Sequence, residues 1–419
     1  MRRGRKVFSG HYDNHPLWFD TLNRIWSLTY PIGTAASLDK DNLIKTARRK
    51  TGLQDLGPDF WDEPLERLIW SIEHEANLHP IGRFITRQRL INLLSVRLRA
   101  EWWFKAHPEI LEQDLYPVWM IAGLQRTGTT KLQRLLSADP ENRPLLSWEA
   151  INPVPVGKEM VHPDPRIRIA RTSENALKLI APDFFAIHPV EHQAPEEDIL
   201  LLDVSFLSTT TEATMHVPAY AAWLEKTDQS LAYAYSAKLL KFLQWQRPAR
   251  RWVLKSPHHL EFLPIIHKHF GDVRFLWTHR QVDQCIPSFL SMVSFSRAIF
   301  SNNIDPESVA AHWVRKTAFM LSKALAFRKM PGNESLFTDI FYEQFTDTPI
   351  DTMQAIYQEN GKLSSQLKAQ FEKANSTNPR GKYGSHHYKL SDFNLSAEDL
   401  SIQMAGYQQF IRNKMTQQN

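Results

Sequence analysis

The chain has 419 residues, of which 42% are hydrophobic and 23% charged, and its formal net charge is +5 at pH 7. These are ordinary values for a globular protein with a sizeable core. The mild basicity suits an anionic small-molecule ligand, but it is too diffuse to argue for nucleic acid, which we exclude as a partner.

Compartment signals are sparse. Cys285 is the single cysteine, so no intrachain disulfide can form and nothing points to an oxidising environment. The basic start, Met1–Lys6, is not followed by the apolar stretch of a signal peptide. No run approaches the ~20 apolar residues of a membrane span. We expect a cytoplasmic protein without a transmembrane segment, and the basic start leaves peripheral contact with a membrane open.

The first part of the chain has the periodicity of helices. In Glu63–Trp70 and Arg87–Phe104, Leu, Ile and Trp recur at spacings of three and four residues, with Arg and Glu between them. Pro80-Ile-Gly82 interrupts this pattern. We predict that residues 1–113 form a helical N-terminal extension and that residues 114–419 form a nucleotide-binding domain.

From residue 116 onward, strand and helix patterns alternate. The short apolar run Tyr116–Gly123 ends in glycine and predicts a buried strand, and Thr129–Ala138 has a helical leucine face. The pattern recurs in a strand over Arg251–Pro257 with a helix over His258–Phe270, and in a strand over Val273–Arg280 with a helix from Asp283. This alternation predicts an α/β fold with a central parallel sheet flanked by helices.

Three further elements are expected toward the end of the chain. Ser335–Tyr342 predicts another strand, and the polar stretch Asn375–Tyr388 is interpreted as a loop. Residues 396–419 are expected to form a closing helix, clearest over Ala397–Arg412.

The most informative stretch is Gly123-Leu-Gln-Arg-Thr-Gly-Thr-Thr130, which lies between a predicted strand and helix. Its glycines and final threonine fit the spacing of the phosphate loop, G-x-x-x-x-G-K-[ST]. In such a turn, backbone N–H groups and the helix N-terminus converge on an anion. The turn therefore predicts a P-loop-like nucleotide site.

One departure from the phosphate loop affects the predicted chemistry. Thr129 stands where the loop lysine grips the phosphates of a triphosphate, which weakens the interpretation as an ATPase or kinase. A cation, Arg126, lies inside the loop instead, where its fixed charge could reach a transferred group.

Arg126-Thr-Gly-Thr-Thr130 resembles the 5′-phosphosulfate loop of sulfotransferases that use 3′-phosphoadenosine-5′-phosphosulfate (PAPS), which usually reads Lys/Arg-Ser-Gly-Thr-Thr. The resemblance implies that PAPS is the sulfuryl donor. It assigns donor binding to the loop residues Gln125, Arg126, Thr127, Gly128, Thr129 and Thr130, and it also gives Arg126 a catalytic role.

A second element of that family is an Arg with a Ser eight positions later, which holds the 3′-phosphate. Arg280 and Ser288 have this spacing after a predicted strand. The segments Pro195–Glu197, Leu239–Gln244 and Trp252–Leu260 also resemble the bacterial branch of the family. The similarity spans residues 117–395. Lys131 departs from eukaryotic members, which have a Trp there against adenine, so no adenine contact is assigned.

Sulfuryl transfer to an alcohol needs a base for the hydroxyl proton, and histidine titrates near neutrality. His258 and His259 follow Lys255-Ser-Pro257, and the bacterial branch commonly reads Lys-Ser-Pro-x-His. The resemblance therefore favours His259 over His258 as the base, and it implies that Lys255 contacts the leaving phosphate or the sulfuryl group.

The remaining candidates are peripheral to the two loops. Glu196 and Glu197 are expected to border the acceptor pocket, with Glu197 the next candidate for the base. Arg380 and Lys382 lie in a segment similar to the family's C-terminal Arg-Lys-Gly segment, which closes over the donor; an unrelated basic loop is the alternative. We expect no metal site.

The sequence thus predicts an enzyme that moves the sulfuryl group of PAPS in line, without metal, to a hydroxyl of a small-molecule or lipid acceptor. The alternatives are a small-molecule kinase of the P-loop type and a non-catalytic nucleotide-binding protein. The acceptor and the oligomeric state are left open.

Overall fold

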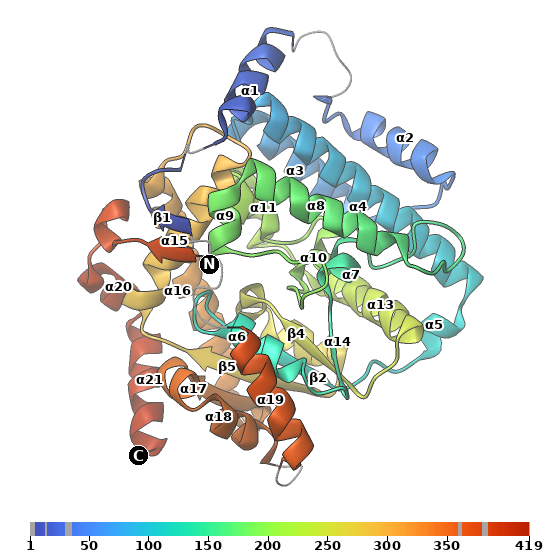
Figure 1. Cartoon of the computed structure of the whole chain (residues 1–419). Coiled ribbons are helices and arrows are strands. Elements are labelled where there is room, and N and C mark those ends of the chain that lie inside the picture. Colours follow the sequence, from blue (N-terminus) through green and yellow to red (C-terminus); the bar gives the residue numbers. More distant parts are fainter. Residues whose placement is uncertain (1–4, 13–14, 30–35, 359–362, 379–383, 419) are drawn as a thin grey trace.

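The computed structural model describes residues 5–12, 15–29, 36–358, 363–378 and 384–418, and every statement below refers to them. Within these residues, five parallel strands form the central sheet in the order β3-β4-β2-β5-β6 (Figure 1). They are β2 (Val118–Gly123), β3 (Asn142–Pro144), β4 (Arg251–Lys255), β5 (Val273–His279) and β6 (Phe337–Phe341). The predicted parallel sheet is confirmed.

Both faces of the sheet are buried, because alternate side chains of each strand enter two different cores. In β2, Val118 and Met120 belong to the larger core, whereas Trp119 and Ile121 belong to the smaller one. β4 repeats the alternation, with Trp252 in the larger core and Val253 in the smaller. This explains why the strands are apolar runs rather than alternating patterns.

Helices cover the two faces unequally. The smaller core lies under α6 (Thr129–Leu136), α17 (Tyr342–Asp347), α18 (Pro349–Ile356) and α19 (Ser365–Thr377). Helices that contribute to the larger core are α2 (Lys40–Thr51), α3 (Asp62–Glu75), α4 (Pro80–Ala106), α5 (Glu109–Glu112), α7 (Ser147–Ile151), α10 (Ile199–Asp203), α12 (Pro218–Leu224), α13 (Ser230–Gln246), α14 (Leu263–Phe270), α15 (Val282–Ala298), α16 (Pro306–Arg328), α20 (Ala397–Gln403) and α21 (Ala405–Gln418), with the 3₁₀ helices η3 (Asp59–Trp61), η4 (Pro257–Glu261) and η7 (Leu390–Phe393).

The remaining helices surround the sheet or connect these layers. They are α1 (Leu17–Thr29), α8 (Pro165–Ile180), α9 (Pro182–Ile187) and α11 (Thr210–Thr214), with the 3₁₀ helix η5 (Asn333–Leu336). None of the described helices combines the length and apolar character needed to cross a bilayer.

The strand order places a ligand site. From β2 the chain runs to the edge strand β3 and returns to β4 between them, and it then crosses to β5 and β6 on the other side of β2. In open α/β sheets, ligands bind beyond the carboxyl ends of the strands where the strand order reverses. Here that position is the end of β2, where the turn into α6 begins.

The N-terminal region is helical, as predicted, but it also contains a strand. β1 (Arg5–Phe8) pairs in parallel with β7 (Gly384–His387) to form a second, two-stranded sheet. Because α4 packs in the same core as the central strands, the chain before residue 113 is joined to the rest by extensive burial (Figure 1). The domain boundary at residue 113 stays a prediction.

Three local expectations differ from the structure. Residues 258–270 form η4 followed by α14, with Pro264 in the first turn of α14, where it needs no intrahelical N–H partner. The stretch expected to be a loop over 375–388 contains the end of α19 and all of β7, whose strand partner lies near the N-terminus. The closing helix is divided into α20 and α21 at Met404.

Candidate active site

The turn between β2 and α6 is tightly bent against β5. A Cβ on Gly123 would overlap both the side chain and the carbonyl oxygen of Thr278, so no larger residue fits here. Thr127 donates from its Oγ1 to the carbonyl of Leu124 at 2.6 Å and lies 2.6 Å from Thr278 Oγ1. Arg126 and Gly128 have positive φ angles of 68° and 90°. The turn is thus held in the curled form that can surround an anion.

Arg126 connects the turn to the second predicted element. Its Nε donates to Ser288 Oγ at 3.0 Å, and Arg280 donates from Nη1 to the Arg126 carbonyl at 2.9 Å. The Arg280 guanidinium also lies 4.1 Å from the centre of the Tyr342 ring, which favours a cation. Residues more than 150 positions apart in the sequence are therefore brought into one cluster at the carboxyl edge of the sheet.

A cavity of about 420 Å³ adjoins this cluster. Its walls come from the turn and α6, the end of β4, the chain after α9, and β7. The polar side chains on these walls are those of Arg126, Thr130, Arg134, His188, Glu191, Glu196, Lys255, Asn378, Ser385, His386 and Tyr388. Of the predicted residues, the cavity brings together Arg126, Thr130, Lys255 and Glu196. Gln125 is half-buried and Thr129 is buried, and neither lines it.

Lys255 is buried in the cavity wall and is paired with a carboxylate. Its Nζ donates to Glu197 Oε1 at 2.6 Å, and its backbone N–H donates to Asp198 Oδ1 at 3.1 Å. The side chain of Lys255 is 3% exposed and that of Glu197 is 23% exposed. A buried ammonium needs such a partner, because its desolvation would otherwise be costly. Glu197 therefore holds the charged Lys255 at the edge of the cavity.

The two predicted histidines lie behind that wall. His259 is fully buried, with Nε2 2.8 Å from Asp198 Oδ2 and Nδ1 2.9 Å from the Tyr233 hydroxyl. His258 Nδ1 lies 3.1 Å from Thr209 Oγ1, and burial holds its pKa well below the usual histidine range. Neither residue lines the cavity. The role of His259 as base stays a prediction, and in this arrangement both of its ring nitrogens are already hydrogen-bonded.

Two other histidines do line the cavity. Burial lowers the pKa of His188, helped by the charges of Lys255 and Arg126 and opposed by Glu196 and Glu197. Burial, with Arg126 nearby, lowers the pKa of His386 to about 3. His386 Nε2 lies 2.8 Å from Ser291 Oγ. Both imidazoles are therefore neutral at pH 7, the form that can accept a proton.

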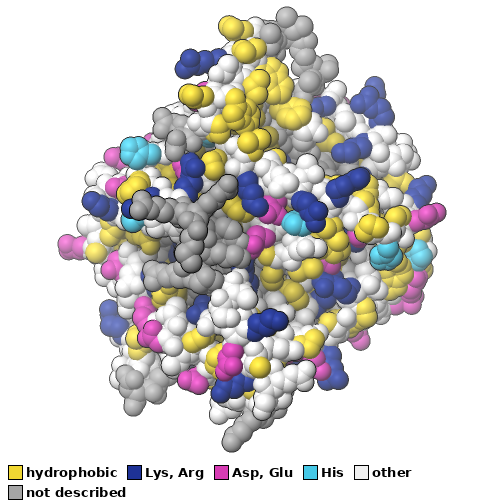
Figure 2. Space-filling model, in the orientation of Figure 1, with side chains coloured by type: hydrophobic (Ala, Val, Ile, Leu, Met, Phe, Trp, Pro, Cys, Tyr) yellow, Lys and Arg dark blue, Asp and Glu magenta, His cyan; other side chains and the backbone are white. Residues whose placement is uncertain are grey.

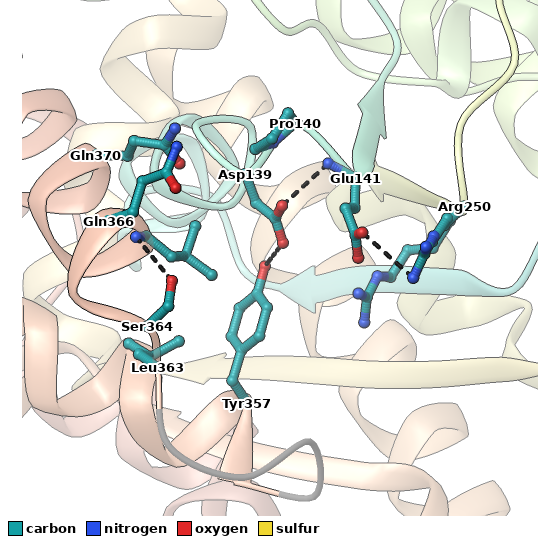
Figure 3. Close-up of a pocket in the computed structure, with 11 residues that line it drawn as sticks. Asp139, Pro140, Glu141, Arg250, Tyr357, Leu363, Ser364, Gln366 and Gln370 are labelled. Carbon is teal, nitrogen blue, oxygen red and sulfur yellow. Dashed lines mark hydrogen bonds and ion pairs between the residues drawn. The ribbon is translucent and has the colours of Figure 1, made fainter.

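A second cavity, of about 510 Å³, lies at the opposite edge of the sheet (Figure 3). It adjoins the residues that precede β3 and β4, and its charged side chains are Asp139, Glu141, Arg250 and Arg251. Asp139 Oδ2 accepts from the Tyr357 hydroxyl at 2.7 Å, and Glu141 pairs with Arg250 at 3.2 Å. Its place at the amino ends of the strands and its carboxylates make it a poor phosphate site, so we assign the active site to the first cavity.

Two of the predicted donor contacts cannot be placed: Arg380 and Lys382 lie outside the described residues. Among the residues that are described, no group of three or more His, Cys, Asp or Glu side chains is arranged to hold a metal ion.

Comparison with known proteins identifies the family. Residues 117–361, from the start of β2 through α18, match the model of the sulfotransferase family. The chain belongs to the sulfotransferase family. This match includes the turn at Gly123, the cavity-lining segment around His188, and both Arg280 and Ser288.

Solved sulfotransferase structures share the fold over most of their length. Sulfotransferase STF1 from Mycobacterium tuberculosis H37Rv is 28% identical with a TM-score of 0.76, and the match covers 88% of this chain and 98% of STF1. Sulfotransferase STF9 from Mycobacterium avium is 25% identical with a TM-score of 0.79, and the match covers 88% and 95% of the two chains. No curated protein sequence matches the chain.

Sequence reasoning missed the part of the candidate site that comes from distant segments. His188 follows α9, and His386 lies in β7, a strand that forms only against β1. Neither residue has a motif around it. The one signal available was composition, because the 375–388 stretch is rich in polar residues and histidine.

Proposed function

We propose that this sulfotransferase uses PAPS as donor and transfers its sulfuryl group to a hydroxyl of a small-molecule or lipid acceptor. The observation that carries the proposal is the contact between the two family elements. The turn at Arg126 and the Arg280–Ser288 element meet at 2.9 and 3.0 Å. Their cations lie beside a curled turn with its N–H groups at the start of α6, which suits a ligand carrying anionic groups at two positions.

The bound donor supplies a sulfuryl group on a phosphosulfate, so the acceptor oxygen forms a new S–O bond while the bridging S–O bond breaks and adenosine 3′,5′-bisphosphate leaves. Arg126, Lys255 and the N–H groups of the turn provide positive charge where negative charge develops. By analogy with phosphoryl transfer, positioning and electrostatics are expected to supply most of the catalysis. Arg280 and Ser288 are assigned to the 3′-phosphate.

The proton of the acceptor hydroxyl needs a base that reaches the cavity, and we assign this role to His188. It lines the cavity with Glu196, and its lowered pKa leaves the imidazole neutral at pH 7. Among the described residues, its ring nitrogens form no hydrogen bond with a protein group. His259 is the alternative base predicted from the sequence, with Glu197 after it.

Titration calorimetry in EDTA tests the donor assignment. We expect adenosine 3′,5′-bisphosphate to bind without magnesium and far more tightly than ATP, because Thr129 replaces the lysine that grips a triphosphate. Tighter binding of ATP, or a requirement for magnesium in the binding of either nucleotide, would contradict the proposal.

The variant Arg280→Ala tests which phosphate the second element holds. It should weaken binding of the bisphosphate by about 1.5–3 kcal/mol, the free energy of a hydrogen bond to a charged group. Binding of adenosine 5′-phosphosulfate, which lacks the 3′-phosphate, should hardly change. Equal losses for both ligands would show that Arg280 supports the fold of the turn, through its bond to the Arg126 carbonyl, rather than the nucleotide.

A further inference from the structure

Helix α1 exposes a continuous apolar face. Leu17, Leu22, Ile25 and Leu28 are 86%, 47%, 56% and 83% exposed, and Trp18 is 40% exposed. Of the fifteen large hydrophobic side chains that are exposed in the described residues, six lie within residues 8–28. Figure 2 shows a cluster of hydrophobic surface over α1, at the top of the molecule.

The opposite side of the helix packs on the body of the protein. Phe19 is fully buried, where its ring meets that of His79, and Asn23 Oδ1 accepts from the backbone N–H of Ile81 at 3.0 Å. These contacts attach α1 to the start of α4. A contiguous exposed apolar surface usually marks an interaction site, so the exposed face of α1 has the composition of a surface that is covered in use.

Charge around this face favours an anionic occupant. Residues 5–12 and 15–29, the described part of this segment, contain Arg5, Lys6 and Arg24 against the single acid Asp20, and Arg5 is paired with Asp183. Lys6 in β1 and Arg24 in α1 are both exposed. A helix with an exposed cation, Arg24, and with Leu, Ile and Trp on its exposed face has the character of helices that lie in the plane of a membrane interface.

The same segment is joined to the candidate active site. β1 pairs with β7 from Arg5↔Gly384 to Phe8↔His387, and β7 contributes Gly384, Ser385 and His386 to the cavity wall. Phe8, at the end of β1, is 50% exposed and stacks on His387 with ring centres 4.8 Å apart. A partner that covers the exposed face of α1 would therefore lie near the β1–β7 strand pair beside the cavity.

We propose that the exposed face of α1 binds in the plane of an anionic lipid surface. Leu17, Trp18, Leu22, Ile25 and Leu28 enter the boundary between headgroups and acyl chains, and the neighbouring cations contact the headgroups. This holds the sulfotransferase at the surface where apolar alcohols partition. The binding surface is separate from the donor site, so its test does not depend on the identity of the donor.

Cosedimentation of the full chain with lipid vesicles tests the proposal. We expect binding to vesicles of phosphatidylcholine and phosphatidylglycerol, weaker binding to phosphatidylcholine alone, and partial release by salt. The double variant Leu22→Gln/Ile25→Gln should lower the vesicle partition coefficient at least about tenfold, because two apolar side chains no longer leave water. Brominated lipids should quench the fluorescence of the wild type more than that of Trp18→Phe.

The matched control is Leu231→Gln/Ile402→Gln, which removes a Leu and an Ile of similar exposure from α13 and α20. It should bind vesicles like the wild type, and all variants should keep the wild-type melting temperature and affinity for the bisphosphate. Absence of wild-type binding to anionic vesicles would overturn the proposal, as would equal binding by the α1 variant. A dimer that forms without lipid and is lost in the α1 variant would also overturn it, because a second copy would then cover the face.

Discussion

At the scale of single residues, the site depends on which polar groups face the cavity and which hold the wall in place. Asp198 accepts from the backbone N–H of Lys255 with one oxygen and contacts His259 with the other, at 3.1 and 2.8 Å. Because Asp198 and His259 are both 1% exposed, their contact is a buried scaffold behind Lys255. The geometry favours a positioning role for His259 and a chemical role for groups such as His188.

The base assignment predicts different consequences for the two histidines. His188→Ala should lower kcat about 10²–10⁴-fold with little change in bisphosphate affinity or melting temperature, and the acidic limb of the pH–rate profile should disappear. His259→Ala should instead lower the melting temperature, because it leaves the buried Asp198 with an unpaired oxygen, at a cost of about 1–3 kcal/mol.

The pH–rate profiles and thermal melts of the two variants, measured side by side, decide whether His188 or His259 is the base. A His259→Ala enzyme with wild-type stability and no acidic limb would restore the sequence prediction that His259 is the base. If both variants keep the limb, the base is a carboxylate, and Glu197→Gln and Glu196→Gln are the next variants to measure.

At the scale of elements, the turn from β2 to α6 depends on how closely β2 approaches β5. The two strands pair in register from Val118↔Val273 to Gly123↔Thr278. Gly123 lies where the Thr278 side chain and carbonyl occupy the space that a Cβ would need. The glycine at the start of the phosphate-loop pattern is therefore required by packing as well as by the turn.

Gly123→Ala should destabilise the protein by about 1–3 kcal/mol, the usual cost of overpacking, and should weaken bisphosphate binding because the turn must shift. Urea unfolding and calorimetry measure the two effects. Gly406→Ala in α21 is the matched control: it has no atom within 4 Å of the added Cβ and should stabilise by about 0.5–1 kcal/mol. Equal stability of the two variants would contradict the packing argument.

At the scale of the whole molecule, burial keeps several histidines neutral. Burial lowers the pKa of His79 to about 4 and that of His386 to about 3. In the unfolded chain these groups titrate near 6.5, so below that pH the unfolded state binds more protons than the folded state. Their contribution therefore lowers the free energy of unfolding as the pH falls below 6.5.

Each of these two histidines should lower the free energy of unfolding by about 2 kcal/mol as the pH falls from 6.5 to 5. The variant His79→Asn removes one titrating group and still allows the side chain to cap α4, where His79 Nδ1 now accepts from Gly82 N–H at 2.8 Å. Urea unfolding at pH 6.5 and 5 should show a smaller loss for this variant than for the wild type. His11→Asn, at an exposed position, is the control, and equal losses in all three proteins would contradict the prediction.

The sequence by itself determined the strands of the central sheet and the two motifs that resemble the family's donor-binding elements. Gly123–Thr130 could be interpreted from eight residues, because a glycine-containing turn between a buried strand and a helix leaves few backbone paths. Arg280 and Ser288 could be assigned because their spacing resembles the second element of the family, and the structure places each against Arg126. The contact between these two motifs is seen only in the structure, and it agrees with the rule that parallel strands present their carboxyl ends at one edge.

Only the tertiary structure decided which side chains enter the cavity. His386 reaches it because β7 pairs with β1, a strand almost 380 residues earlier, and no local pattern encodes that pairing. His259 faces away because Asp198 and Tyr233 lie behind η4, and a 3₁₀ helix turns its residues differently from the α-helix that the spacing predicted. Backbone preferences act over a few residues, whereas the direction of a buried polar side chain depends on partners that arrive from distant parts of the chain.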